Sequence, residues 1–151
     1  MAVHFHAYTW VGSGAEYGRD AQRRPYNPGP NPDPAVRPEF DFRQVPVAPL
    51  EPAHWLLKDK KFVRDTFHEP GPALAWFEKE FAQHVDRLDG EHVRDPGTLR
   101  GFLDYARENM AAGQDIIGGW WGVKGSRFHA VHLIACPNRM RPEHPCPTGG
   151  R

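Results

Sequence analysis

The chain has 151 residues, the length of one ordinary domain, and its 19 basic residues balance its 19 acidic residues. A neutral protein lacks the long-range field that attracts nucleic acid or anionic lipid, so we expect neither as a general partner. The sequence also lacks an apolar run of roughly 18 residues, a typical secretory signal and a disulfide framework, since it has two cysteines. These features predict a cytoplasmic protein with no membrane partner.

Residues 3–11, VHFHAYTWV, alternate between two kinds of side chain. Val3, Phe5 and Ala7 fall on one side, whereas the intervening positions carry His4, His6, Tyr8 and Trp10. A period of two with many β-branched and aromatic residues is typical of a β-strand. We therefore expect an N-terminal strand whose odd-numbered residues face the core.

Residues 13–50 form a proline-rich arm, with six prolines between positions 25 and 38. Proline has no N–H group to donate to a β-ladder, so this segment is predicted to be a loop. The arm is too long for a plain connection. It either has no fixed structure or wraps the domain, with Tyr26, Phe40 and Phe42 as anchors.

Helices are predicted in the middle of the chain. Apolar residues recur at steps of three and four between residues 72 and 88, and Gly90 follows as a stop signal. A second helix is expected over 95–113, with Asp95 as its N-cap, Pro96 in its first turn and Gly113 at its end. One or two short helices are plausible between residues 51 and 70.

The last third predicts a β-hairpin. Residues 116–123 and 126–136 are rich in β-branched and aromatic residues, and Lys124-Gly125 between them suits a two-residue turn. That register places Trp120 opposite His129 and Trp121 opposite Phe128. The complete pattern predicts one α+β domain over 1–136: a small antiparallel sheet (the N-terminal strand plus the hairpin) covered by two or three helices, with the proline-rich arm. Residues 137–151 are predicted to be a loose tail.

His4 and His6 are the main candidate site. Side chains two apart on a strand start roughly 7 Å apart on one face, and two imidazoles can converge on one metal from there. A third ligand is expected from the last strand, where His129 and His132 are three apart and so face opposite sides. We favour His129. The predicted site thus contains His4, His6 and His129 as metal-binding or catalytic residues, and Tyr8, Trp10 and Trp120 as ligand-binding residues. Its cofactor would be a divalent transition metal such as zinc, or none if the site works without metal.

Other interpretations use the same residues. His132, Cys136, His144 and Cys146 form a Cys2His2 set on paper, but positions 132 and 136 of an extended strand are about 13 Å apart. Cys136 at the end of a strand is a candidate nucleophile that would need a distant base such as His6. The simplest alternative is that the histidine and aromatic face packs beneath the arm.

Three functions remain open from the sequence. In the first, the protein is a metal-binding enzyme or binding protein whose site lies on the strand face that carries His4 and His6. The metal would act there as a Lewis acid or would activate a water molecule. Alternatively, it is a metal-free, nuclease-like enzyme that uses one histidine as a base and another as an acid. The third possibility is a non-catalytic module in which the arm or an exposed tryptophan binds a protein partner.

Overall fold

The computed structural model describes residues 2–149 and contains one four-stranded antiparallel sheet. Its strands are β1 (His4–Ser13), β2 (Asp65–Phe67), β3 (Ile116–Gly122) and β4 (Arg127–Cys136), in the order β2-β1-β4-β3. The α-helices are α1 (Gly14–Tyr17), α2 (Pro70–His84) and α3 (Pro96–Ala111). The predicted α+β class, with the first strand beside the C-terminal hairpin, is confirmed.

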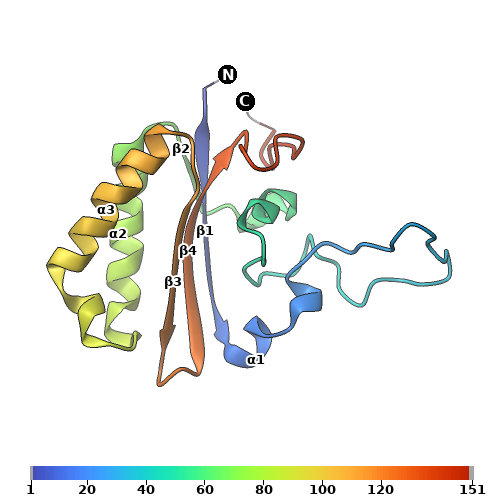
Figure 1. Cartoon of the computed structure of the whole chain (residues 1–151), viewed down its shortest axis with the longest axis horizontal. Helices are drawn as coiled ribbons and strands as arrows, with labels where there is room; N and C mark the ends of the chain where they lie inside the picture. The colour runs from blue at the N-terminus through green and yellow to red at the C-terminus, as the bar shows by residue number, and fades with distance from the viewer. Residues whose placement is uncertain (1, 150–151) are drawn as a thin grey trace.

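The sheet lies between two layers (Figure 1). Helices α2 and α3 cover one side, which we call the helix face, and the arm covers the other, which we call the arm face. Strands β1 and β4 are central and have both faces covered. The helix face carries the odd-numbered residues of both strands, among them Phe5, Ala7, Val131, Leu133 and Ala135. The arm face carries their even-numbered residues, among them Tyr8, Trp10, Ala130, Ile134 and Cys136.

The two long helices form where the apolar spacing predicts them. In α2, Leu74, Phe77 and Phe81 are buried against the sheet, and a 3₁₀ turn over 85–87 follows. In α3, the Asp95 carboxylate accepts a hydrogen bond from Gly97 N, and Pro96 occupies the first turn. Across residues 2–149, no helix has the length and apolar character needed to span a membrane.

The arm packs on the sheet through its second half. Residues 24–39 are largely exposed, whereas Phe42 and Val47 are buried. A 3₁₀ turn over Pro52–Leu57 presents Trp55, which stacks on Tyr8 at 4.6 Å between ring centroids. Its indole Nε1 donates a hydrogen bond to His132 Nδ1 at 2.9 Å. Of the expected aromatic anchors, Phe42 is therefore the buried one, and Tyr26 is exposed.

Two buried basic side chains, Arg23 and Lys58, donate hydrogen bonds to backbone carbonyl groups of the arm. Arg23 donates from Nε to the carbonyl of Ala48 at 2.8 Å, and its guanidinium lies 3.7 Å from the centroid of the Tyr17 ring. Lys58 donates to the carbonyl of Phe42 at 3.1 Å and lies 3.9 Å from the centre of the Phe42 ring. Burial lowers the pKa of Lys58 to about 7. Apolar packing is therefore not the only interaction that holds the arm in place. Arg23 and Lys58 also bind its backbone carbonyl groups and lie against aromatic rings.

The hairpin has the predicted register but a longer turn. Trp120 lies opposite His129 and Trp121 opposite Phe128, as expected. The paired residues nearest the turn are Gly122 and Arg127, so four residues, 123–126, connect the strands. The connection is therefore longer than expected, although Lys124 and Gly125 are the central residues of a turn in which Ser126 N donates to Val123 O at 3.3 Å. Positive φ angles at Val123, Lys124 and Gly125 are supported by the Asp89 carboxylate, which accepts hydrogen bonds from the last two backbone N–H groups.

Gly122 is required by a close approach of the backbone. A Cβ atom at this position would lie 2.4 Å from the carbonyl oxygen of Arg87 and 3.1 Å from His129 Nε2.

We expect Gly122→Ala to lower the free energy of unfolding by about 1–3 kcal/mol, because the backbone of the 85–87 turn would have to shift. Gly101→Ala in α3 is the matched control, since its Cβ would meet nothing within 4 Å. That change should stabilise the helix by about 1 kcal/mol. Urea denaturation of both variants tests this, and equal effects of the two would contradict it.

Candidate metal centre

Four side chains converge at one end of the arm face: His4 and His6 of β1, Cys136 at the end of β4, and Cys146 of the C-terminal tail. The antiparallel register brings three of them together, because His4 lies directly opposite Cys136 and His6 is two residues further along the same face. The ligand atoms of all four lie within 4.8 Å of one another. This His/Cys group could hold a metal ion.

The spacing of the ligand atoms resembles that around a tetrahedral zinc ion. His4 Nε2 and His6 Nε2 are 3.2 Å apart, and Cys146 Sγ lies 3.4 Å from His6 Nε2 and 3.6 Å from His4 Nε2. Zinc bonds of about 2.05 Å to nitrogen and about 2.3 Å to sulfur give tetrahedral edges of about 3.3 Å (N to N) and about 3.6 Å (N to S). Three of the edges of the group therefore already have the length that zinc requires.

The protein surroundings favour neutral imidazoles in this group. His4 and His6 are buried, with exposed fractions of 3% and 0%. Burial, followed by the nearby His4 and His68, lowers the pKa of His6 to about 4; burial also lowers the pKa of His4. A metal ligand must be a neutral imidazole, so neither ring has to lose a proton at neutral pH.

The pKa of the Cys136 thiol shifts in the opposite direction from the pKa values of the two imidazoles. Burial, together with Cys146, raises the pKa of Cys136 to about 12. A buried thiol with this pKa is a poor nucleophile, and the structure gives the proposed Cys136 nucleophile no activated thiolate. A bound cation would reverse the balance, because zinc binds the thiolate form.

Polar groups outside the four ligands orient them. His6 Nδ1 lies 2.9 Å from Thr66 Oγ1 of β2, so the Nε2 atom of that ring is directed into the group. Cys146 Sγ lies 3.4 Å from Thr148 Oγ1. The buried hydroxyl of Tyr8 has no hydrogen-bond partner within residues 2–149, and its pKa is raised by burial first and then by the two thiols. An ionised sulfur nearby would be an acceptor for that hydroxyl.

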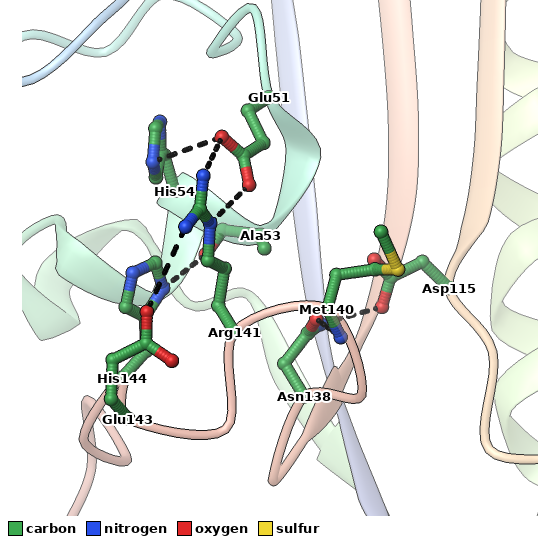
Figure 2. Close-up of polar contacts among 9 residues, drawn as sticks. All are labelled: Glu51, Ala53, His54, Asp115, Asn138, Met140, Arg141, Glu143 and His144. Atoms are coloured by element: carbon green, nitrogen blue, oxygen red, sulfur yellow. Dashed lines mark hydrogen bonds and ion pairs between the residues drawn. The ribbon is translucent and has the colours of Figure 1, made fainter.

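The tail reaches the centre because it is fixed at several points (Figure 2). Asn138 is buried and donates to the Asp115 carboxylate at 3.0 Å. Arg141 forms a bidentate ion pair with Glu51 at 2.5 and 3.0 Å, and His144 Nδ1 lies 3.3 Å from the carbonyl oxygen of Ala53. These contacts bring residues 137–149 back over the arm face. The predicted boundary at residue 136 stays a prediction, but the tail makes specific contacts with the sheet and the arm.

His129 lies on the other side of the sheet. It faces α2, where its Nδ1 is 3.1 Å from His84 Nδ1, and it shares the helix face with Val11. The expected grouping of His129 with His4 and His6 is therefore corrected: Cys136 and Cys146 complete the group. The reason is register, because β1 pairs with β4 so that His132, opposite Tyr8, lies on the arm face. His132 itself accepts a hydrogen bond from the indole N–H of Trp55.

The aromatic residues expected to bind a ligand are mostly packed. Tyr8 and Trp10 are buried on the arm face, with Trp10 stacked on Tyr17 at 6.1 Å. Trp120 lies on the helix face against Phe81, at 5.0 Å between ring centroids. A direct ligand-binding role for these three residues, and a catalytic role for the histidines, stay predictions.

Cys146 is the candidate ligand that the sequence alone does not place correctly. The sequence suggests it as a zinc ligand together with Cys136, His132 and His144, whereas the structure groups it with His4, His6 and Cys136. The missing signal was the pairing of the first and last strands, which sets the HxH motif beside Cys136. A second cysteine ten residues further on, after a short proline-containing loop, then supplies the fourth ligand.

Comparison with protein-family models, with curated proteins and with solved structures gave no match. The fold and the four residues define an α+β protein with a His2Cys2 group that could hold a metal, and its function has to be inferred from that geometry.

Proposed function

We propose that this protein is a zinc-binding protein and that the ion, held by His4, His6, Cys136 and Cys146, has a structural role. The observation that carries the proposal is the close match of three interatomic distances to the edges of a zinc tetrahedron. Two imidazoles and two thiolates are a common set for zinc, and four protein ligands leave no position for a substrate. The zinc-enzyme hypothesis, which needs an open position, is therefore less well supported than a structural site.

The site joins parts of the chain that are far apart in the sequence. His4 and Cys136 belong to adjacent strands, whereas Cys146 comes from the tail. An ion bound to all four would attach the tail to the end of the sheet over the arm face. Its role would be to fix residues 137–149, together with the Arg141–Glu51 ion pair.

Metal analysis of the untagged protein tests this proposal. We expect close to one zinc per chain, and a large loss of zinc from Cys146→Ser and His6→Ala because each removes one of four ligands. His144→Asn is the matched control, since His144 lies in the same tail but contacts the carbonyl of Ala53. Replacement of zinc by Co²⁺ should give the visible spectrum of a tetrahedral cobalt–thiolate complex. Zinc absent from the wild type, or equally present in His6→Ala, would exclude the proposal.

A further inference from the structure

The outer edge of β1 is uncovered along half of its length. Strand β2 pairs only with residues 5–7 of β1, and the N–H of Arg64 extends this contact to the carbonyl of Ala7 at 2.8 Å. Beyond Ala7, no strand among residues 2–149 lies on this side of β1. Alternate residues of an antiparallel strand direct both backbone polar groups to the same side. Thr9 and Val11 therefore present two N–H and two C=O groups at the open edge.

This edge is the floor of a groove of about 800 Å³. Pro46, Lys61, Phe62 and Arg64 form the wall on the arm side, and Glu80, Gln83 and His84 of α2 form the opposite wall. Both layers extend past the edge of the sheet. A single extended chain that lies about 4.8 Å from β1, the usual distance between neighbouring strands, would occupy the space between these two walls. The β1 strand of a second copy would carry its own two walls, and these would collide with the first pair.

The charges of the groove differ between its ends. Arg64 donates from Nε to Thr9 Oγ1 at 3.1 Å and places a cation at the end near Thr9, whereas Lys61 and Glu80 add one charge of each sign to the two walls. Glu16 accepts a hydrogen bond from the N–H of Ser13 at 3.2 Å and lines the other end, which is acidic. A bound chain that runs antiparallel to β1 would place its N-terminal side at Glu16 and its C-terminal side at Arg64.

We propose that this groove binds an extended peptide segment of a partner protein as an additional antiparallel strand next to β1. The backbone groups of Thr9 and Val11 supply the main hydrogen bonds, as in other cases of strand addition. The charged ends select a segment with a basic residue four positions before an acidic one. The acidic residue lies just beyond the paired part of the segment, because Arg64 occupies the place next to Ala7 on the edge of β1. The residue opposite Trp10 lies on the arm face beside Phe62 and is apolar, whereas its two neighbours face polar side chains of α2 (Glu80, Gln83 and His84) and are therefore polar, for example threonine.

A peptide of sequence Lys-Thr-Val-Thr-Glu, blocked at both ends, tests this inference with ¹⁵N-labelled protein. We expect the largest amide shifts at Thr9 and Val11. N-methylation of the two peptide threonines should weaken binding on the order of tenfold or more, because it removes the N–H groups that pair with β1. N-methylation of the peptide valine is the control, since its N–H points away from β1, and binding should be unchanged. Equal weakening by the two modifications, or shifts that avoid Thr9 and Val11, would overturn the proposal.

A charge exchange tests the orientation independently. Arg64 is exposed, so Arg64→Glu should fold normally. We expect this variant to bind the peptide several-fold more weakly and to recover affinity for a peptide that carries lysine in place of the final glutamate. No recovery, or dimerisation of the protein through β1 in the absence of peptide, would show that the groove is not used in this way. Neither outcome bears on the zinc proposal, because the groove contains none of the four metal ligands.

Discussion

Removal of zinc by a chelator is expected to lower the free energy of unfolding by about 4 kcal/mol relative to protein in free zinc at about 1,000 times the dissociation constant. A ligand that binds only the folded state stabilises it by this amount. The ligands His4 and Cys146 lie in segments 142 positions apart, so the unfolded chain cannot retain the site. The local effect should be greatest in residues 137–149, whose amide hydrogens should exchange faster without the metal. Thermal unfolding and hydrogen exchange with and without chelator measure both effects.

Two variants separate loss of the metal from other effects of the chelator. Cys146→Ser should already have the lower stability and should not respond to chelator, whereas His144→Asn should respond like the wild type. An unfolding transition of the wild type that is the same with and without chelator would contradict the expected result.

Acidification of the metal-free protein is expected to destabilise it strongly between pH 6.5 and pH 4, with His132 as one identifiable cause. Burial lowers the pKa of His132 to about 4 from its ordinary value of 6.5. The unfolded state therefore binds a proton at a higher pH than the folded state. The stabilising contribution is complete above pH 6.5 and is lost as the pH falls toward 4. A shift of this size corresponds to about 3 kcal/mol.

The hydrogen bond from Trp55 gives this titration a matched control. Protonation of His132 would place a hydrogen on Nδ1, the atom that accepts the indole N–H at 2.9 Å. His132→Asn keeps an acceptor near that position but removes the titrating group. The free energy of unfolding, measured with denaturant at several pH values between 4 and 6.5, should therefore change less steeply with pH in the variant than in the wild type. The expected difference in slope is about 1 kcal/mol per pH unit. His6, whose pKa is also lowered to about 4, should account for a comparable part of the remaining slope. Identical slopes for the two proteins would exclude His132 as a cause.

Local periodicity was sufficient to predict most of the fold. The alternation in residues 3–11, the helical spacing around Phe77 and the paired strands of the hairpin are signals that neighbouring residues carry. Strand β2 was missed, because three residues, Asp65–Phe67, are too few to show a period. The turn between β3 and β4 was also longer than its Lys-Gly pair indicated, since its conformation depends on the distant carboxylate of Asp89.

The site was predicted only in part, for a different physical reason. The HxH motif depends on the local rule that residues two apart share a face, and this rule placed His4 and His6 together. Whether His129 or His132 lies on that face depends on the register between strands more than 100 residues apart, which no local pattern specifies. The position of Cys146 depends further on tail contacts, such as Arg141 with Glu51, that no periodicity reveals.

The location of the four ligands gives the proposed ion a topological effect as well as a local one. Since His4 and Cys146 are 142 positions apart, zinc would close the chain between them into one long loop in the folded state. Closing a loop of this length costs about 4–5 kcal/mol of chain entropy, and because the unfolded chain does not retain the site, this cost recurs each time the protein folds. A circular permutant that joins the two ends through a linker and opens the exposed segment 24–39 would bring His4 and Cys146 close together in the sequence and should therefore avoid most of this loop-closure cost.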